Sequence, residues 1–160
     1  FCLSRGLGDV YKRQNKNRVS ASLNENIRIQ TFQMIERDGE IDEFEFETNG
    51  TWQEKRQAEY IRYDEVVENL EVHVTLKIQN GEVRLLRSGN IKQNLHFIEG
   101  NDTMSLYEIP TGKIPLTIRT LSINHYVQPE QSKLKVRYEL YQNEEKMGTY
   151  LYQITYKELK

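Results

Sequence analysis

The chain of 160 residues is poor in the residue types that mark several classes of protein, with one cysteine, three prolines and one tryptophan. A single cysteine excludes a disulfide within the chain and a zinc site built from several cysteines. No apolar run approaches the roughly 20 residues of a membrane-spanning helix, so we expect no membrane partner. The core must therefore come from packed side chains, which a chain of this length can supply.

The cysteine, Cys2, and the only Gly-x-Gly, at residues 6–8, lie in a segment that does not read as evolved protein. Asp9–Gln14 corresponds to a translation of the end sequence that fragmentation transposases leave on sequencing-library DNA. We interpret residues 1–14 as translated adapter and exclude them from fold and function. This exclusion removes thiolate catalysis as well, and we expect the segment to be disordered or extended and to pack against nothing.

The charge of the remaining residues, 15–160, is mildly acidic. They keep 19 of the 22 basic and 23 of the 24 acidic residues, a net charge of −4. Such a balance gives no general attraction to nucleic acid or to an anionic membrane. The length suits one domain, and the lack of cysteine favours a reducing, cytoplasmic location.

Strict alternation of apolar and polar residues dominates the chain. Five apolar residues alternate with polar ones over residues 70–78, and Asn80-Gly81 then predicts a tight hairpin turn into the next alternating run. Further runs of this kind lie at 27–35, 41–48, 58–63, 91–97, 104–109, 114–120, 134–140 and 150–156. In the first of them the apolar face changes between Ile29 and Phe32, which predicts a β-bulge.

About ten short strands joined mostly by tight turns predict an all-β antiparallel meander. Such a sheet must close or fold on itself to remove its edges. We expect residues 26–160 to form one β-barrel of roughly 8–10 strands, with residues 15–25 as a lead-in. A two-sheet β-sandwich is the alternative, because it would bury one face of each strand in the same way.

The order of several short segments resembles the YwiB-like family. The segments are Tyr60-Ile61-Arg62-Tyr63-Asp64-Glu65, Arg87-Ser88-Gly89, Phe97, Tyr107, Pro110-Thr111-Gly112, Thr120, Tyr138-Glu139-Leu140 and Ile154-Thr155-Tyr156-Lys157. The resemblance covers about residues 26–160. It implies a calycin-like β-barrel, related in shape to lipocalins, in an uncharacterised bacterial-type protein. It implies no activity, because the family is a domain of unknown function.

Residues that usually carry catalysis or hold metals are few and scattered. His73, His96 and His125 lie on different segments with no partner at metal-ligand spacing, so we expect them to be ordinary histidines rather than ligands. No nucleophile motif or phosphate-binding glycine loop occurs in residues 15–160. We therefore expect no enzymatic activity, no cofactor and no metal.

A dense run of carboxylates between residues 36 and 47 has a simpler interpretation than acid–base chemistry. Glu43, Glu45 and Glu47 alternate with Phe44 and Phe46, which places the three acids on one strand face. We interpret this face as solvated and resistant to aggregation.

Four polar residues share the phase of apolar neighbours and should point into the barrel: Arg87, Gln93, Thr120 and Tyr138. A buried arginine needs a carboxylate, a carbonyl or an anionic ligand to offset its desolvation. The leading hypothesis is that these residues bind a small amphipathic or apolar ligand inside the barrel. Alternatively, Arg87 lies at a strand end, reaches solvent and binds nothing.

A basic patch supports a second hypothesis. Lys133, Lys135 and Arg137 share the outward face of one strand, and Arg119 lies in the strand before it. An outer basic face is typical of a protein- or RNA-interaction module. The acidic net charge and the lack of an aromatic RNA-binding motif make nucleic acid the weaker partner.

Overall fold

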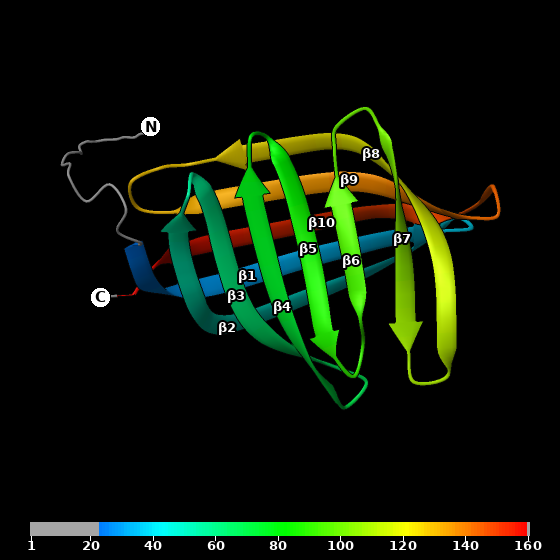
Figure 1. The fold of residues 1–160 in the computed structure, drawn as a ribbon, viewed down its shortest axis with the longest axis horizontal. Helices are drawn as coiled ribbons and strands as arrows, with labels where there is room; N and C mark the ends of the chain where they lie inside the picture. The colour runs from blue at the N-terminus through cyan, green and yellow to red at the C-terminus, as the bar shows by residue number, and fades with distance from the viewer. Residues whose placement is uncertain (1–22, 160) are drawn as a thin grey trace.

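The structure, a computed structural model, describes residues 23–159, which form ten antiparallel strands (Figure 1). The predicted adapter, residues 1–14, lies outside the described residues. The strands are β1 Leu23–Arg37, β2 Glu40–Lys55, β3 Ala58–Val67, β4 Leu70–Gln79, β5 Glu82–Gly89, β6 Gln93–Phe97, β7 Asp102–Ile109, β8 Gly112–Tyr126, β9 Ser132–Gln142 and β10 Glu145–Glu158. The all-β prediction is confirmed. Among the described residues no helix is long and apolar enough to cross a membrane.

One continuous sheet contains all ten strands in the order β6-β5-β4-β3-β2-β1-β10-β9-β8-β7. The chain is a meander whose first and last strands pair with each other, so the sheet curls and its two end strands, β6 and β7, come back side by side (Figure 1). The result is a nearly closed barrel. The sandwich alternative fails because the hydrogen-bonded order is not divided into two separate sheets.

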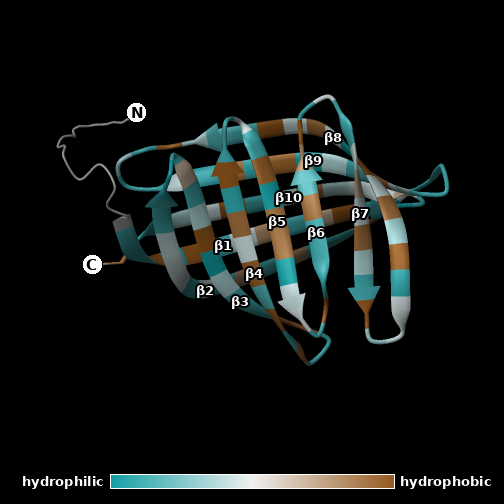
Figure 2. Cartoon of the chain, in the orientation of Figure 1, coloured by the Kyte–Doolittle hydropathy of each residue, from teal (hydrophilic) through white to brown (hydrophobic). Residues whose placement is uncertain are grey.

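Alternation builds the core as the sequence predicts. Hydrophobic and hydrophilic bands alternate along the strands (Figure 2). The side chains of β4 and β9 that point inward are almost wholly buried. The β4–β5 turn has positive φ at Asn80 (53°) and Gly81 (79°), as a tight hairpin of this type requires. Inward apolar side chains from all parts of the sheet meet in a single buried cluster.

Gly50 marks the place where β2 changes neighbours. β2 pairs with β1 along its whole length but with β3 only from Thr51 to Lys55. A Cβ atom at Gly50 would lie 2.3 Å from the Arg62 carbonyl oxygen and 2.6 Å from Ile29 Cδ1, so only glycine allows β3 to approach this closely. Residues 40–49 of β2 consequently have β1 on one side and an open edge on the other.

The bulge predicted in the first strand is wrong. β1 keeps continuous register with both β2 and β10, and Thr31 lies on the inward row with Ile29, only 2% exposed. Thr31 and Gln33 are polar residues on this inward row, so the sequence pattern wrongly indicates that the apolar side of the strand changes. Bulges occur elsewhere, in β8 between Thr120 and Ser122 and in β10 between Lys146 and Gly148.

Candidate functional site

The four polar residues predicted to face inward all lie on inward rows of the barrel. Arg87 on β5 and Gln93 on β6 are register partners, and Arg87 Nη1 donates to Gln93 Oε1 at 2.8 Å. Thr120 on β8 and Tyr138 on β9 are also register partners, and both are buried. The structure therefore forms two pairs, one on β5 and β6 and the other on β8 and β9.

Arg87 is paired with an acid that sequence reasoning missed. Its Nε donates to Glu65 Oε1 at 2.8 Å, and the two side chains are 13% and 9% exposed. Burial opposes the charge of Arg87, but the Glu65 carboxylate outweighs it and raises the pKa of the guanidinium above its usual value. Glu65 continues the inward row of Ile61 and Tyr63, which was the available signal. A protein carboxylate, rather than a ligand, thus offsets the desolvation of Arg87.

Tyrosine side chains surround this ion pair. The hydroxyl groups of Tyr63 and Tyr152 form a 2.7 Å hydrogen bond across the interior. Burial raises the pKa of both hydroxyls, and it raises the pKa of Tyr138 to about 12 although Arg87 acts in the opposite direction. These phenols stay protonated near neutral pH, so they offer hydrogen bonds and not a base.

Aromatic rings pack against Tyr138, one of the residues expected to bind a ligand. The Tyr138 ring lies 4.7 Å from that of Phe97 and 5.3 Å from that of Tyr150, measured between centroids. Offset and tilted rings at these distances pack favourably. Tyr138 and its neighbour Thr120 are therefore part of the packed wall of the barrel.

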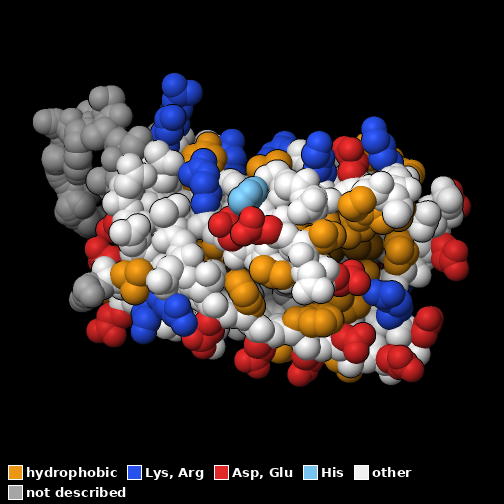
Figure 3. Space-filling model, turned by 90° about the horizontal axis from the view of Figure 1, so that it is seen from below, with side chains coloured by type: hydrophobic (Ala, Val, Ile, Leu, Met, Phe, Trp, Pro, Cys, Tyr) orange, Lys and Arg blue, Asp and Glu red, His pale blue; other side chains and the backbone are white. Residues whose placement is uncertain are grey.

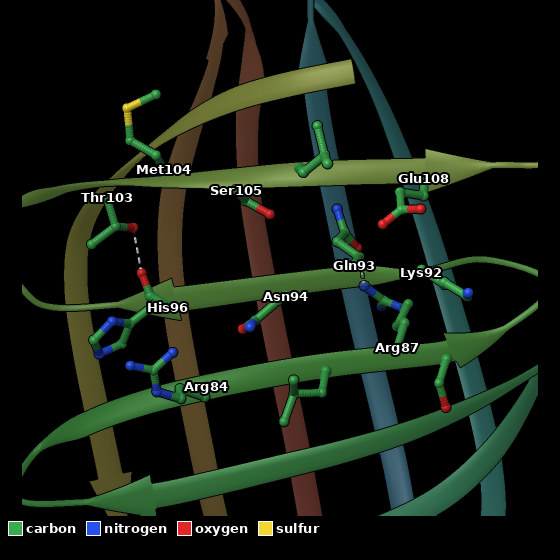
Figure 4. Close-up of a pocket in the computed structure, with 13 residues that line it drawn as sticks. Arg84, Arg87, Lys92, Gln93, Asn94, His96, Thr103, Met104, Ser105 and Glu108 are labelled. Carbon is green, nitrogen blue, oxygen red and sulfur yellow. Dashed lines mark hydrogen bonds between the residues drawn. The ribbon is translucent and has the colours of Figure 1, made fainter. Parts of the chain in front are cut away.

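A groove opens where the barrel fails to close, between β6 and β7. Lys92 and Glu108 exchange two backbone hydrogen bonds at one end, and Thr103 Oγ1 donates to the His96 carbonyl oxygen at the other. Between these points no backbone hydrogen bond joins β6 and β7 within the described residues, and a space of about 690 Å³ lies along the two strands. This volume is in the range of small-molecule sites. We call this space the β6–β7 groove; its lining includes Arg84, Leu86, Arg87, Gln93, Ser105 and Leu106 (Figure 4).

The lining combines apolar side chains with unpaired polar groups. Ser105 points from β7 into the space between β7 and β6 (Figure 4), and its buried Oγ has no hydrogen-bond partner among the described residues. Arg84 and Lys92 form no ion pair within residues 23–159, whereas Glu108 lies 4.0 Å from Lys113. The groove is thus positive at its rim and has an unsatisfied hydroxyl in its wall.

An apolar hollow lies at the adjacent end of the barrel. Figure 3 looks at the end that carries the β3–β4, β5–β6 and β7–β8 turns, and hydrophobic side chains gather there around a depression. Val67, Tyr107 and Ile114 lie close to these turns and are partly buried against the core. The Lys92–Glu108 bridge lies at this same end of the groove, so the positive rim and the apolar end are neighbours.

The predicted basic face is present, but one of its members is paired. Lys133, Lys135 and Arg137 alternate along the outer face of β9 and form no ion pair within the described part of the chain. Arg119 instead binds Asp102 through Nε at 3.0 Å and Nη2 at 3.2 Å. We therefore define the basic row as Lys133, Lys135 and Arg137 alone.

Each histidine has a single polar partner. His73 Nδ1 lies 2.7 Å from Asp64 Oδ1, His96 Nε2 lies 2.8 Å from Glu82 Oε1, and His125 Nε2 lies 2.9 Å from the Tyr156 hydroxyl. The described residues contain no group of three or more histidine, cysteine or acidic side chains able to hold a metal ion.

Comparison with known proteins agrees with this architecture. Residues 27–154 match the family model described as a domain of unknown function, DUF1934. The chain belongs to this family. It is 30% identical over 123 residues to the uncharacterized beta-barrel protein YwiB of Bacillus subtilis (strain 168). The aligned residues cover 77% of this chain and 87% of that protein.

The crystal structure of the ywiB protein from Bacillus subtilis superposes on this DUF1934 chain with a TM-score of 0.78 at 27% sequence identity. The match covers 86% of this chain and 94% of the other. The predicted family resemblance and barrel fold are both confirmed, and the DUF1934 family supplies no activity for either protein.

Proposed function

We propose that this barrel is a non-catalytic binding protein that takes up a small amphipathic anion in the β6–β7 groove. The observation that carries the proposal is the Ser105 hydroxyl, which is buried in the groove wall without a partner. An unsatisfied buried hydroxyl costs about 1–3 kcal/mol, and a ligand atom that displaces the groove wall to reach Ser105 Oγ would supply the missing hydrogen bond. Such a cost is tolerated at sites that are completed by a ligand.

The charge of the groove favours an anion. Arg84 and Lys92 are cations at the rim with no partner among the described residues, and Arg87 lies behind them. Because Glu65 already neutralises Arg87, the excess positive charge belongs to Arg84 and Lys92. A carboxylate or sulfonate beside either of these cations would gain a charge-assisted hydrogen bond.

The apolar lining favours a ligand with a hydrophobic part. Leu86, Met104 and Leu106 line the groove, and Met104 is 75% exposed. A ligand that covers these side chains gains about 25 cal/mol for each Å² of apolar surface removed from water. We place the ligand in the groove rather than in the interior, because two aromatic rings pack against Tyr138.

The groups near the groove support binding rather than catalysis. His96 is bound to Glu82 and forms no hydrogen bond to Ser105, so no base is positioned to activate this hydroxyl. Arg87 is held by Glu65 and Gln93. Fixed, fully charged groups of this kind orient a ligand but do not exchange protons with it.

The proposal is tested with two fluorescent probes of similar shape, the anion 1-anilinonaphthalene-8-sulfonate and the uncharged N-phenyl-1-naphthylamine. The double variant Arg84→Glu/Lys92→Glu should weaken binding of the anion about two- to fivefold, because a partly exposed ion pair with either cation contributes about 0.5–1 kcal/mol. The uncharged probe should bind this variant as it binds the wild type. Ser105→Leu, which fills the groove, should weaken binding of both.

A matched control changes the same charge elsewhere. Lys55 and Lys157 are exposed and lie outside the groove and the basic row, so Lys55→Glu/Lys157→Glu should leave both probe affinities unchanged. Equal anion affinity in wild type and Arg84→Glu/Lys92→Glu would show that the groove is not the binding site. Loss of anion binding in the Lys55/Lys157 variant would likewise reject it, because net charge alone would then explain the effect.

A further inference from the structure

Part of strand β8 forms an open edge of the described sheet. β8 pairs with β7 only over Gly112–Arg119, but it pairs with β9 as far as Tyr126. Among the described strands, residues 121–126 therefore have β9 on one side and none on the other, and Figure 1 shows this part of β8 along the top of the molecule. An edge of this kind presents backbone groups that can pair with another chain.

Backbone hydrogen bonds show which groups face the open side. Thr120 exchanges hydrogen bonds with Gly100 and Asn101, and Ile123 N donates to Glu99 Oε2 at 3.3 Å, both on the side away from β9. Because these directions alternate along an antiparallel strand, the N–H and C=O of His125 point to the same open side. Within residues 23–159 no bond from that side reaches the His125 backbone.

Exposed apolar side chains accompany this edge. Leu121, at the β8 bulge, is 42% exposed, Tyr126 is 50% exposed, and Val127 directly after the strand is 67% exposed. Three large apolar residues at one strand edge are a surface that another chain can cover.

The basic row lies on the next strand, and none of its register partners among the described residues is acidic. The register partners of Lys133 are Tyr126 and Thr155, those of Lys135 are Asn124 and Gln153, and those of Arg137 are Ser122 and Leu151. Elsewhere on the sheet, cations sit beside acids: Arg28 pairs with Glu47 and Lys146 with Glu139. The row is thus a strip of positive charge with no ion-pair partner among the described residues, beside an open edge.

We propose that the β8 edge, residues 121–126, binds an extended acidic segment of a partner protein by β-strand addition. The added strand would lie about 4.8 Å from β8 and about 10 Å from β9. Glutamate side chains on its outer face then come within reach of Lys133 and Lys135 (about 10 Å spanned by two long side chains) and lie beside Tyr126, which shares that face with Lys133. Main-chain bonds supply affinity in this mode, and side chains supply selectivity.

Two other occupants fit the surface less well. Residues 1–22 carry five basic residues and one acidic residue, so their charge does not complement the basic row. RNA would find positive charge there, but its phosphates do not use the alternating donors and acceptors of a strand edge, and the chain is acidic overall.

The test uses an eight-residue, end-capped, fluorescein-labelled peptide that alternates glutamate and valine, measured by fluorescence anisotropy. Lys133→Glu/Lys135→Glu should weaken its binding at least tenfold, and raising the salt concentration should weaken binding to the wild type. The same peptide N-methylated at alternate residues keeps every charge but cannot pair with an edge, so it should lose binding. Lys55→Glu/Lys157→Glu, with the same change in net charge, should bind like the wild type.

Three results would overturn the inference. Equal binding of the N-methylated peptide would show charge attraction without strand addition. Tighter binding of a uridine octanucleotide that displaces the peptide would identify the row as an RNA site. Self-association in sedimentation equilibrium that the peptide reverses would identify a second copy of the chain as the occupant. None of these results bears on the β6–β7 groove, whose test uses other residues and other probes.

Discussion

The barrel has two seams where distant parts of the sheet meet, and they differ in how completely they close. At the seam between β1 and β10, ten residues from Ile27 to Glu36 are paired in continuous register. At the seam between β6 and β7, the bridge between Lys92 and Glu108 is the single backbone pairing described. The first seam closes the barrel, and the second leaves the β6–β7 groove.

The inward side chains account for this difference. At the closed seam Ile29 and Ile154 are completely buried. At the open seam the inward positions include Gln93 and Ser105, whose polar ends gain nothing from a tightly sealed apolar wall. Strand pairing is thus strong where it also buries hydrocarbon and weak where it would bury unsatisfied polar groups.

Breaking the buried ion pair of Glu65 and Arg87, beside the open seam, should have the largest effect on the free energy of unfolding. Glu65→Leu leaves Arg87 charged and unpaired, so we expect a loss of about 3–5 kcal/mol in the free energy of unfolding, measured by urea denaturation. The double variant Glu65→Leu/Arg87→Met removes the charge as well and should recover most of this loss. If the double variant is no more stable than Glu65→Leu, the pair is not the reason for the cost.

Truncation at the closed seam should be the next largest effect. Ile29→Ala removes a side chain that is 0% exposed, and we expect a loss of about 2–5 kcal/mol in unfolding free energy. The same truncation at the open seam, Leu106→Ala, affects a residue that is 45% exposed and should cost about 0.5 kcal/mol or less. Similar losses at the two positions would contradict the comparison of the seams.

Ser105 and Thr120 have buried hydroxyls without a hydrogen-bond partner among the described residues. Substitutions at these two positions distinguish binding in the groove from binding at the packed wall. Thr120→Val replaces a buried, unsatisfied hydroxyl by a methyl group of similar size and should raise unfolding free energy by about 1 kcal/mol. Ser105→Ala should weaken binding of 1-anilinonaphthalene-8-sulfonate, whereas Thr120→Val should not. Weaker probe binding in Thr120→Val, with unchanged binding in Ser105→Ala, would place the ligand inside the barrel after all.

Alternation along single strands explains why most of the fold was predictable from the sequence. It identified the strands, the Asn80-Gly81 turn and the inward direction of Arg87 and Tyr138, because each depends on residues a few positions apart. It failed at Thr31, where a buried polar residue imitated a bulge. The hydrophobic pattern fixes a strand's face only when the inward residues are apolar.

The groove and the ion pair were less accessible to sequence reasoning because they depend on non-local register. Glu65 and Arg87 lie on strands separated by β4. The residue pattern within one strand does not predict how three neighbouring strands are aligned. The break between β6 and β7 is a property of sheet closure, which involves every strand at once. Ser105 carried no signal beyond its phase in a short strand.

A surface pair on the outer faces of β3 and β4 gives the smallest expected effect and a baseline for both seams. The hydrogen bond and charge of Asp64 raise the pKa of His73, and the two side chains are 58% and 64% exposed. A raised pKa in the folded state means that the pair stabilises the fold below the ordinary histidine pKa of about 6.5 and that this contribution disappears as pH rises through the folded value. In Asp64→Asn the NMR titration midpoint of His73 should fall, with little change in stability because exposed pairs are weak. An unchanged midpoint would show that the Asp64 contact does not persist in solution.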